Sequence, residues 1–358
     1  MKIVLLSLKG LGDTLIQIPL IRAIKAARPD AQMTILVPDR SCAELFSACP
    51  YMRPVVVPFR KPGLKLAVDI FKLLLFLRSE KFDIALTTFP SNRVWYNLLA
   101  FWTGAPKRIT HSYGYAAART FSFLQNCRVP AGRAKHSVEH NLDLLGPLGM
   151  ARPERPDMTP WLSPEDEGYA DNFLKENGLG AGARIAGIQA AINPDRMYKA
   201  WGPENMAVFA ALMDWLKETA GVTPLLFAGP DEEKSAALIL GMSKYRHLAA
   251  PRAGVNKIGA LMKRCELFIN TDSGLGHLAA AVGTPTVTAF GPSNPALSAP
   301  YGGKGIVINP GLACAPCYSY PYSSVRPQAG CAKRECLRLI DLEKIKDAAA
   351  GQLGLPLP

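Results

Sequence analysis

The sequence predicts an α/β protein of the doubly wound type, built as two Rossmann-like domains. Its 358 residues exceed the roughly 250–300 residues at which a single core stops growing. Short apolar runs alternate with segments of helical spacing in both halves, as in parallel βαβ units. A segment rich in proline and charge, 151–164, separates the halves. We therefore expect an N-terminal domain over 1–160 and a C-terminal domain over 161–358.

The first half opens on an apolar run at 2–8, which is typical of a buried strand. A glycine turn follows, and residues 13–28 have apolar side chains at helical spacing up to Pro29, which ends the helix. Further strands are expected at 33–37, 55–58 and 82–87.

The second half repeats this alternation. Strands are expected at 184–189, 223–228, 266–270, 286–290 and 305–308. Helices are expected at 203–219, 231–241 and 275–282. A last helix at 341–352 could pack on either domain, including back on the first.

Nearly all of the net charge of +12 lies in the first half. Residues 1–160 hold 22 Lys and Arg against 11 Asp and Glu, whereas 161–358 hold 19 against 18. Such a field favours an anionic partner: a phosphorylated lipid, a nucleic acid or a membrane surface. A basic surface that only aids solubility is the alternative. Since no aromatic-basic RNA motif or helix-turn-helix spacing occurs, we expect no nucleic acid.

The first apolar run is too short and too soon polar for a signal peptide or a membrane span, which predicts a cytoplasmic protein. The apolar segment 64–77 is likewise too short and too charged to cross a bilayer. Two interpretations stay open for it: a buried helix, or a helix lying on a membrane surface. The second would place the protein peripherally at the inner face of the cytoplasmic membrane.

The first glycine turn, Gly10-Leu-Gly12-Asp13, lies between a predicted strand and a predicted helix. It lacks the Lys-Ser/Thr of a P-loop and the third glycine of the dinucleotide fingerprint, so neither an ATPase nor a standard dehydrogenase is indicated. Asp13 remains at the carboxyl end of the first strand, where α/β sheets bind ligands. Helix capping is the alternative role for Asp13.

A second turn, from Asp272 through Ser273 and Gly274 to His277, leads from a strand into a short helix. The free N–H groups at such a helix start can bind a phosphate without a metal. Alternatively, Asp272 or Ser273 is a plain cap and His277 a structural histidine.

Two charged residues extend this second constellation. Lys199 follows the strand at 184–189 through a polar loop and could neutralise a diphosphate, or be an exposed loop lysine. Glu232 follows the next strand and could accept hydrogen bonds from ribose hydroxyls, or favour a helix N-terminus.

Four cysteines near the C-terminus have the spacing C-x2-C-x13-C-x4-C, which is compatible with tetrahedral zinc. Two disulfides are disfavoured in a reducing cytoplasm, and free thiols are the other alternative. The candidate structural zinc ligands are Cys314, Cys317, Cys331 and Cys336.

Several of these motifs, taken in order, resemble glycosyltransferase family 9, the ADP-heptose:lipopolysaccharide heptosyltransferases. They are the opening strand with Leu-Gly-Asp-Thr-Leu, Lys199-x-Trp201, the Gly-Pro-Asp-Glu of 229–232, and the block from Asp272 to Pro292. The resemblance spans almost the whole chain, and the last block is its most specific part.

The resemblance implies a GT-B fold, in which the two domains face a central cleft. It implies that the first domain binds the acceptor, a phosphorylated lipid A-core or similar anionic glycolipid, and that the second binds an ADP-sugar. Transfer of heptose or a related sugar would be inverting and metal-independent, with no required cofactor. The resemblance assigns Asp13 as the general base, Lys199 to the donor phosphates and Glu232 to the ribose. The donor site would be lined by Asp272, Ser273, Gly274 and His277.

One departure from the family pattern is Gly276, where many relatives have a bulkier apolar residue; this could loosen the donor pocket. Two other hypotheses share some of these observations. One is another GT-B nucleotide-sugar enzyme, such as an epimerase or a transferase using a UDP-sugar. The other is a non-catalytic anion-binding protein that uses the basic first half.

Overall fold

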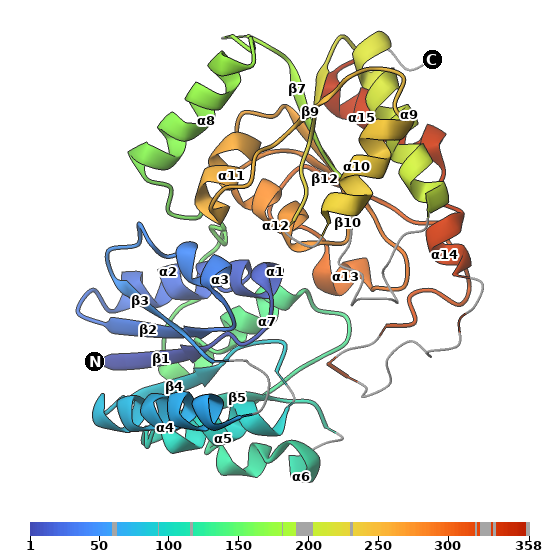
Figure 1. Cartoon of the computed structure of the whole chain (residues 1–358). Coiled ribbons are helices and arrows are strands. Elements are labelled where there is room, and N and C mark those ends of the chain that lie inside the picture. Colours follow the sequence, from blue (N-terminus) through green and yellow to red (C-terminus); the bar gives the residue numbers. More distant parts are fainter. Residues whose placement is uncertain are drawn as a thin grey trace. The chain divides into compact units, whose positions relative to one another are not determined.

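The computed structural model divides into two compact units, Met1–Trp161 (unit 1) and Leu162–Pro358 (unit 2) (Figure 1). It describes all residues except 59–62, 92, 115–116, 181, 191–202, 230–231, 319–320, 323–330, 332–333 and 356–358, and the side chains of 203–204.

Unit 1 is built on a parallel sheet of the order β3-β2-β1-β4-β5-β6, as far as its residues are described. The six strands are β1 (Lys2–Leu6), β2 (Gln32–Val37), β3 (Met52–Val56), β4 (Ile84–Thr87), β5 (Lys107–Ser112) and β6 (Cys127–Pro130). The central strands are buried on both faces because helices cover both sides of the sheet, as an all-parallel sheet requires.

The helices of unit 1 lie in two layers (Figure 1). One side of the sheet carries α1 (Leu11–Leu15), α2 (Ile18–Ala27) and α3 (Arg40–Glu44). The other side carries α4 (Leu64–Ser79), α5 (Val94–Trp102) and α6 (Ala117–Thr120). The remaining elements are the 3-10 turns η1 (Ser122–Leu124) and η2 (Gly146–Leu148) and the helix α7 (Ser137–Asp143).

The single helix expected over 13–28 is instead two helices, α1 and α2. The second begins at Ile18 with Pro19 in its first turn, where the missing N–H of proline costs nothing. Farther inside a continuous helix, Pro19 would lack a donor and crowd the preceding turn. The break falls between Leu15 and Ile18, and it places Gln17 at the N-cap of α2.

Unit 1 ends in a tryptophan that packs back on it. The ring of Trp161 lies 5.9 Å from that of Phe46 and 5.7 Å from that of Tyr51, and the Arg22 guanidinium lies 4.6 Å above it. These contacts fasten the end of the linker to α2 and to the segment between α3 and β3.

Unit 2 repeats the topology. Its described residues form a parallel sheet of the order β12-β11-β10-β7-β8-β9, which is the same 3-2-1-4-5-6 arrangement when numbered from its own first strand. The strands are β7 (Ile185–Gln189), β8 (Thr223–Leu226), β9 (Leu248–Ala249), β10 (Leu267–Thr271), β11 (Thr286–Ala289) and β12 (Gly305–Ile308).

The helices of unit 2 enclose that sheet. Ile345, Ala349 and Leu353 of the last helix enter the same core as α9, β10 and β11, so this helix packs within unit 2. The helices are α8 (Pro164–Glu176), α9 (Pro203–Glu218), α10 (Glu233–Met242), α11 (Val255–Met262), α12 (Gly274–Ala281), α13 (Pro295–Ser298), α14 (Glu335–Arg338) and α15 (Leu342–Leu353).

Over the part of the chain that the structure describes, none of the helices has the length and apolarity needed to cross a membrane.

Both sheets reverse their strand order at one point, between β1 and β4 in unit 1 and between β7 and β10 in unit 2. In open α/β sheets the crevice beyond the carboxyl ends of the strands at such a switch point is where ligands bind. The loops that leave these four strands are therefore the places to look for chemistry.

Candidate active site

At the switch point of unit 1, Leu6 of β1 lies beside Thr87 of β4. Thr88, the residue after β4, is tied to the end of β1, since its hydroxyl donates to the Leu6 carbonyl at 2.8 Å. A narrow cavity, too small to hold a water molecule, lies here. It is lined by Ser7, Leu8, Lys9, Asp13, Gln17, Thr88, Phe89, Pro90 and Tyr96.

Asp13 is half-buried and is the third residue of α1. The N-cap of that helix is Gly10, which has an extended backbone (φ −74°, ψ −176°) and no side chain to cap the helix. Asp13 is therefore not the capping residue, although a carboxylate in the first helical turn still interacts favourably with the helix dipole. Asp13 lines the cavity instead.

A buried polar network holds the loop that carries Asp13. The Gln17 side-chain amide donates to the Ser7 hydroxyl at 2.6 Å and to the Asp13 carbonyl at 2.9 Å. The Thr14 hydroxyl lies 3.1 Å from that of Ser7 and donates to the Gly10 carbonyl at 3.2 Å. Because Ser7, Thr14 and Gln17 are almost fully buried, these bonds are shielded from water and fix the backbone of the loop.

The opposite wall of the cavity rests on two buried histidines. The Phe89 ring stacks on His140 with centroids 4.4 Å apart, and the Phe89 N–H donates to the Asn141 side chain at 2.8 Å. His111, at the end of β5, contacts the His140 carbonyl through Nε2 at 2.9 Å. Burial lowers the pKa of His111 to about 4 and also lowers the pKa of His140. Both rings are neutral at physiological pH and support the wall without charge.

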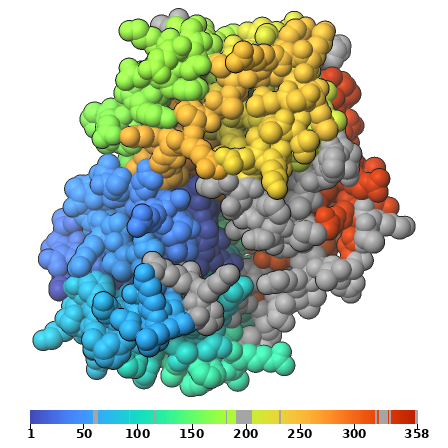
Figure 2. Space-filling model, viewed as in Figure 1, coloured from blue at the N-terminus to red at the C-terminus, as the bar shows by residue number. Residues whose placement is uncertain are grey.

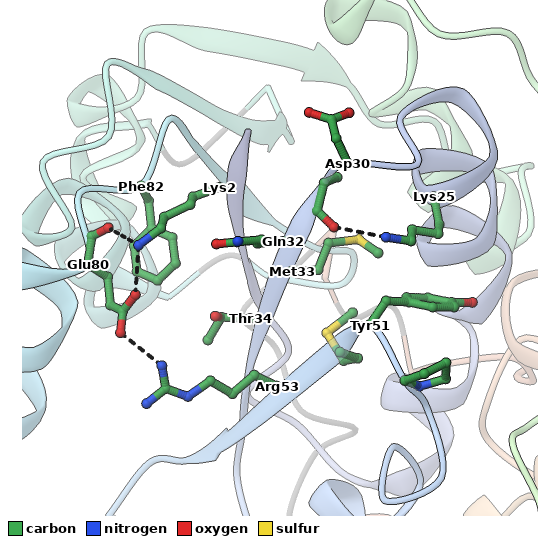
Figure 3. Close-up of a pocket in the computed structure, with 13 residues that line it drawn as sticks. Lys2, Lys25, Asp30, Gln32, Met33, Thr34, Tyr51, Arg53, Glu80 and Phe82 are labelled. Carbon is green, nitrogen blue, oxygen red and sulfur yellow. Dashed lines mark hydrogen bonds and ion pairs between the residues drawn. The ribbon is translucent and has the colours of Figure 1, made fainter.

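A larger cavity of unit 1, about 430 Å³, lies at the opposite edge of the sheet, where the strands begin (Figure 3). Its carboxylates are already paired: Glu80 with Lys2 at 3.4 Å and with Arg53 at 2.8 Å, and Asp30 with the N-terminal amine at 3.5 Å. Because it lies at the amino ends of the strands and its charges are already compensated, we assign it no role in the chemistry.

In unit 2 the switch point is organised by a buried glutamine. Gln189 ends β7 beside Asn270 of β10 and has no solvent exposure. The side-chain oxygen of Gln189 (Oε1) accepts from the Ser273 hydroxyl at 2.8 Å and from the Thr271 hydroxyl at 3.2 Å. The side-chain nitrogen of Gln189 (Nε2) lies 3.4 Å from both carboxylate oxygens of Glu232.

Glu232 is the N-cap residue of α10. Its carboxylate accepts from the Gly229 N–H at 2.7 Å and faces Gln189. Gln189 therefore links two of the predicted residues, Glu232 and Ser273, although they come from different loops.

The start of α12 has the geometry of an anion site. Ser273 is the N-cap with an extended backbone, but its hydroxyl is bonded to Gln189 and makes no cap bond. The N–H groups of the first helical turn, from Gly274 onward, have no acceptor within the helix. Asp272 precedes the cap and donates its N–H to the Ala289 carbonyl at 3.2 Å. His277 is the fourth helical residue and is only 9% exposed.

Gly276 does not loosen the pocket, contrary to expectation. A Cβ atom at this position would lie 2.1 Å from the side-chain nitrogen of Asn270. Asn270 is itself held in place, since it donates to the Thr271 carbonyl at 2.6 Å and accepts from the Thr288 hydroxyl at 3.1 Å. The space beside Gly276 is thus filled by Asn270, whose side-chain amide braces the loop after β10.

Comparison with known proteins decides which family this arrangement belongs to. The sequence profile of glycosyltransferase family 9 (heptosyltransferase) matches residues 70–325, more than half of the chain. The chain belongs to glycosyltransferase family 9. It is therefore a glycosyltransferase, as the motifs at 229–232 and 272–292 predicted.

Relatives agree along nearly the whole length. Lipopolysaccharide heptosyltransferase 2 of Escherichia coli (strain K12) is 25% identical over 321 residues, 86% of this chain and 88% of its own. A family 9 glycosyltransferase from Veillonella parvula has a TM-score of 0.78 at 21% identity and covers 98% of this chain and 97% of its own. The E. coli ADP-heptose lps heptosyltransferase II has a TM-score of 0.74 at 20% identity, with coverage of 99% and 98%. The predicted GT-B fold is confirmed.

Among the other predicted family 9 positions, Lys199 and Trp201 lie outside the described residues. Gln17 and Gln189, which organise the two switch points, were missed. The available signal was weak. Gln17 follows Asp13 by four residues, which puts both on the same face of the helix predicted at 13–28. Gln189 is a polar residue at the end of an apolar strand.

The four C-terminal cysteines are free thiols. Burial, and then the neighbouring thiols, raise the pKa of Cys336 to about 11, and burial also raises the pKa of Cys317. Over the described residues, no three or more His, Cys, Asp or Glu side chains are placed to hold a metal ion. The structural zinc therefore stays a prediction from the cysteine spacing, and the placement of the described side chains does not support it.

Proposed function

We propose that this family 9 enzyme transfers a heptose or a related sugar from ADP-heptose to the lipopolysaccharide inner core or a similar anionic glycolipid. Support comes from the relatives, which are described as lipopolysaccharide heptosyltransferases, one of them specifically for ADP-heptose. The observation that carries the proposal is the pair of switch points: in unit 2 a helix start whose first N–H groups have no helical acceptor, and in unit 1 Asp13 beside a narrow cavity.

Unit 2 would bind the donor. As the bond to the sugar breaks, negative charge grows on the leaving diphosphate, and the N–H groups at the start of α12 would stabilise it. Lys199 would add a positive charge at the same phosphates. Glu232, which Gly229 and Gln189 hold in place, would offer its carboxylate to the ribose hydroxyls.

Unit 1 would bind the acceptor. The attacking acceptor hydroxyl forms a bond to the anomeric carbon while the bond from that carbon to the diphosphate breaks, and ADP leaves with the electron pair. Asp13 takes the hydroxyl proton, so it acts as the general base. A single displacement of this kind inverts the anomeric configuration and needs no metal.

The charge of unit 1 supports an anionic acceptor. Residues 1–160 hold 22 basic and 11 acidic residues. This excess of positive charge would attract a phosphorylated glycolipid and raise its local concentration. Unit 2 lacks this surplus. The cytoplasmic location remains a prediction of the sequence.

The test is a transfer assay with the full chain in the presence of a chelator. ADP-heptose, UDP-glucose and UDP-N-acetylglucosamine are offered in parallel with a phosphorylated lipid A-core acceptor. We expect a product heavier by one heptose with ADP-heptose alone, and inverted anomeric configuration by NMR. Transfer from a UDP-sugar, epimerisation of a sugar nucleotide, or binding without turnover would each contradict the proposal.

A further inference from the structure

One surface of unit 1 exposes large apolar side chains. Fourteen large hydrophobic residues are exposed among those described, and ten of them lie on α4, α5 and the segment 117–124. We call these three elements the apolar layer. The ten residues are Leu64, Val68, Ile70, Phe71, Leu75, Leu98, Phe101, Trp102, Phe121 and Phe123.

Helix α4 is apolar on two opposite sides. Leu73 and Leu77 are buried against the sheet, in the same core cluster as Tyr96 of α5. Leu64 and Phe71 are 84% and 61% exposed, and Val68 and Leu75 complete the series at i, i+4, i+7 and i+11. This spacing puts the four on one outward stripe of the helix. A helix that only covers a sheet needs no second apolar stripe.

The exposed residues lie on neighbouring elements, because the parts of the apolar layer are joined. The Trp102 indole N–H donates to the Leu74 carbonyl at 2.9 Å, which links α5 to α4. The Asn97 side chain donates to the Thr120 carbonyl at 2.8 Å, which links α5 to α6. Figure 1 shows the three elements on the same side of the sheet, and Figure 2 shows α4, light blue to cyan, at the outer surface of unit 1.

Positive charge is concentrated in the same part of the chain. Residues 60–133 hold 12 Lys and Arg and 3 Asp and Glu, so this stretch alone accounts for a net charge of +9 of the total +12. Exposed cations on or beside the apolar layer include Lys65, Lys72, Arg78, Lys81, Arg119 and Arg128.

We propose that the apolar layer is a docking surface for an anionic lipid bilayer. Its aliphatic and aromatic side chains would enter the boundary between headgroups and acyl chains, while Lys65, Lys72 and Arg119 would contact lipid phosphates. Long basic side chains can keep an apolar stem in the lipid boundary and the charge at the headgroups. Scattered apolar residues are ordinary on a protein surface, but a joined set of ten within a strongly basic segment is not.

Charge also argues against a second copy of this chain as the occupant. A two-fold contact would place the same surface of each copy against itself. Two segments of net charge +9 would then face each other, which opposes association. An anionic membrane compensates that charge.

This inference does not depend on the proposed donor, acceptor or catalytic residues, because those lie at the carboxyl edges of the sheets. Its test uses the protein alone, without sugar nucleotide. A failure here would leave the transferase proposal standing, and the reverse also holds.

The experiment is vesicle flotation of the full chain at low and high salt. Vesicles of phosphatidylcholine with phosphatidylglycerol are compared with vesicles of phosphatidylcholine alone. One double variant removes apolar contacts, Phe71→Ser with Phe123→Ser, and a second reverses charge, Lys65→Glu with Lys72→Glu. The matched controls change exposed residues of α10 in unit 2: Leu238→Ser with Met242→Ser, and Lys234→Glu.

We expect binding to the anionic vesicles and a loss of about tenfold or more in each apolar-layer variant, with the α10 controls unchanged. High salt should weaken wild-type binding and remove most of the difference between wild type and the charge variant. All these changes are at exposed positions, and circular dichroism checks that each variant folds. No binding to anionic vesicles, equal losses in the controls, or a wild-type dimer that the Phe71→Ser/Phe123→Ser variant converts to monomer would each overturn the proposal.

Discussion

Unit 1 and unit 2 share one strand order but differ in charge and surface. Unit 1 carries nearly all of the net positive charge and most of the exposed apolar side chains, whereas unit 2 is close to neutral. The topology therefore sets only where a site can form, at the carboxyl edge beside the switch point. The side chains placed there, and on the outer helices, set what each unit binds.

The two switch points show this difference in one residue type. Each has a buried glutamine that bonds to a serine hydroxyl: Gln17 with Ser7 in unit 1, and Gln189 with Ser273 in unit 2. Gln17 fixes the backbone of the loop that carries a carboxylate, whereas Gln189 joins the helix start to Glu232. The same chemistry positions the loop of Asp13 in one unit and the start of α12 in the other.

The largest expected effect comes from the carboxylate of Asp13 at the switch point of unit 1. Asp13→Asn should keep the fold and the affinity for ADP but reduce transfer by about 100-fold or more, because an amide cannot accept the proton. Transfer kinetics and ADP titration measure the two properties separately. The control is Asp30→Asn, an exposed aspartate at the opposite edge of the same sheet. Full activity of Asp13→Asn would remove the distinction between the units.

Acid should destabilise unit 1 through His111. Its pKa of about 4 in the folded state lies below the ordinary 6.5, so between these values the unfolded chain binds the proton and the folded chain does not. The stability contributed by neutral His111 is thus present above pH 6.5 and is lost as pH falls to 4, by about 3 kcal/mol. The free energy of unfolding is measured by urea titration at several pH values, with hydrogen exchange of the β5 amides as the local readout. His111→Gln should flatten this pH dependence; an unchanged slope would contradict the assignment.

A smaller loss of stability is expected in unit 2 from Gly276→Ala. The added methyl group would collide with Asn270 and disturb its bond to Thr288, at a cost of about 1–3 kcal/mol. Gly351→Ala is the control, since Gly351 lies in helix α15 with no atom near its added Cβ. That change should be neutral or stabilise by about 0.5–1 kcal/mol. Equal unfolding midpoints for the two variants would show that Asn270 moves aside freely.

The glutamine pair gives the finest comparison. Gln17→Leu should lower kcat by about tenfold with ADP affinity unchanged, whereas Gln189→Leu should weaken ADP binding by about tenfold. Both changes remove a buried hydrogen-bonded amide of similar size, so each variant serves as the control for the other. If both variants lost kcat and ADP affinity equally, the two switch points would not have separate roles.

Much of the fold could be predicted because apolar periodicity reports burial directly. The strands at 267–271 and 305–308 and the helix at 64–79 were found within one or two residues. Strand β5 was missed, since Lys107–Ser112 is mostly polar and only its position in the sheet buries it. The break between α1 and α2 was also missed, although Pro19, which is tolerated in the first turn of a helix and not farther inside it, could have indicated it.

The site was predicted less completely. The glycine-containing turns that carry Asp13 and Ser273 come after apolar strands, and they were recognised for that reason. Gln17 and Gln189 are neutral and belong to no motif, and they bond to serines outside their own helix or strand: Ser7 for Gln17 and Ser273 for Gln189. For residues 64–77, the sequence left burial and surface exposure as alternatives, and the helix has both: one apolar stripe in the core and one outside.

Hydrogen–deuterium exchange with and without ADP tests the central claim most directly, because it reports which switch point holds the diphosphate. The N–H groups at the start of α12 have no helical acceptor and should exchange quickly until a phosphate binds them. We predict that ADP slows exchange at 272–277 and around Glu232, and leaves 7–17 of unit 1 unchanged. Protection confined to 7–17, or none at 272–277, would contradict the division of roles between the two units.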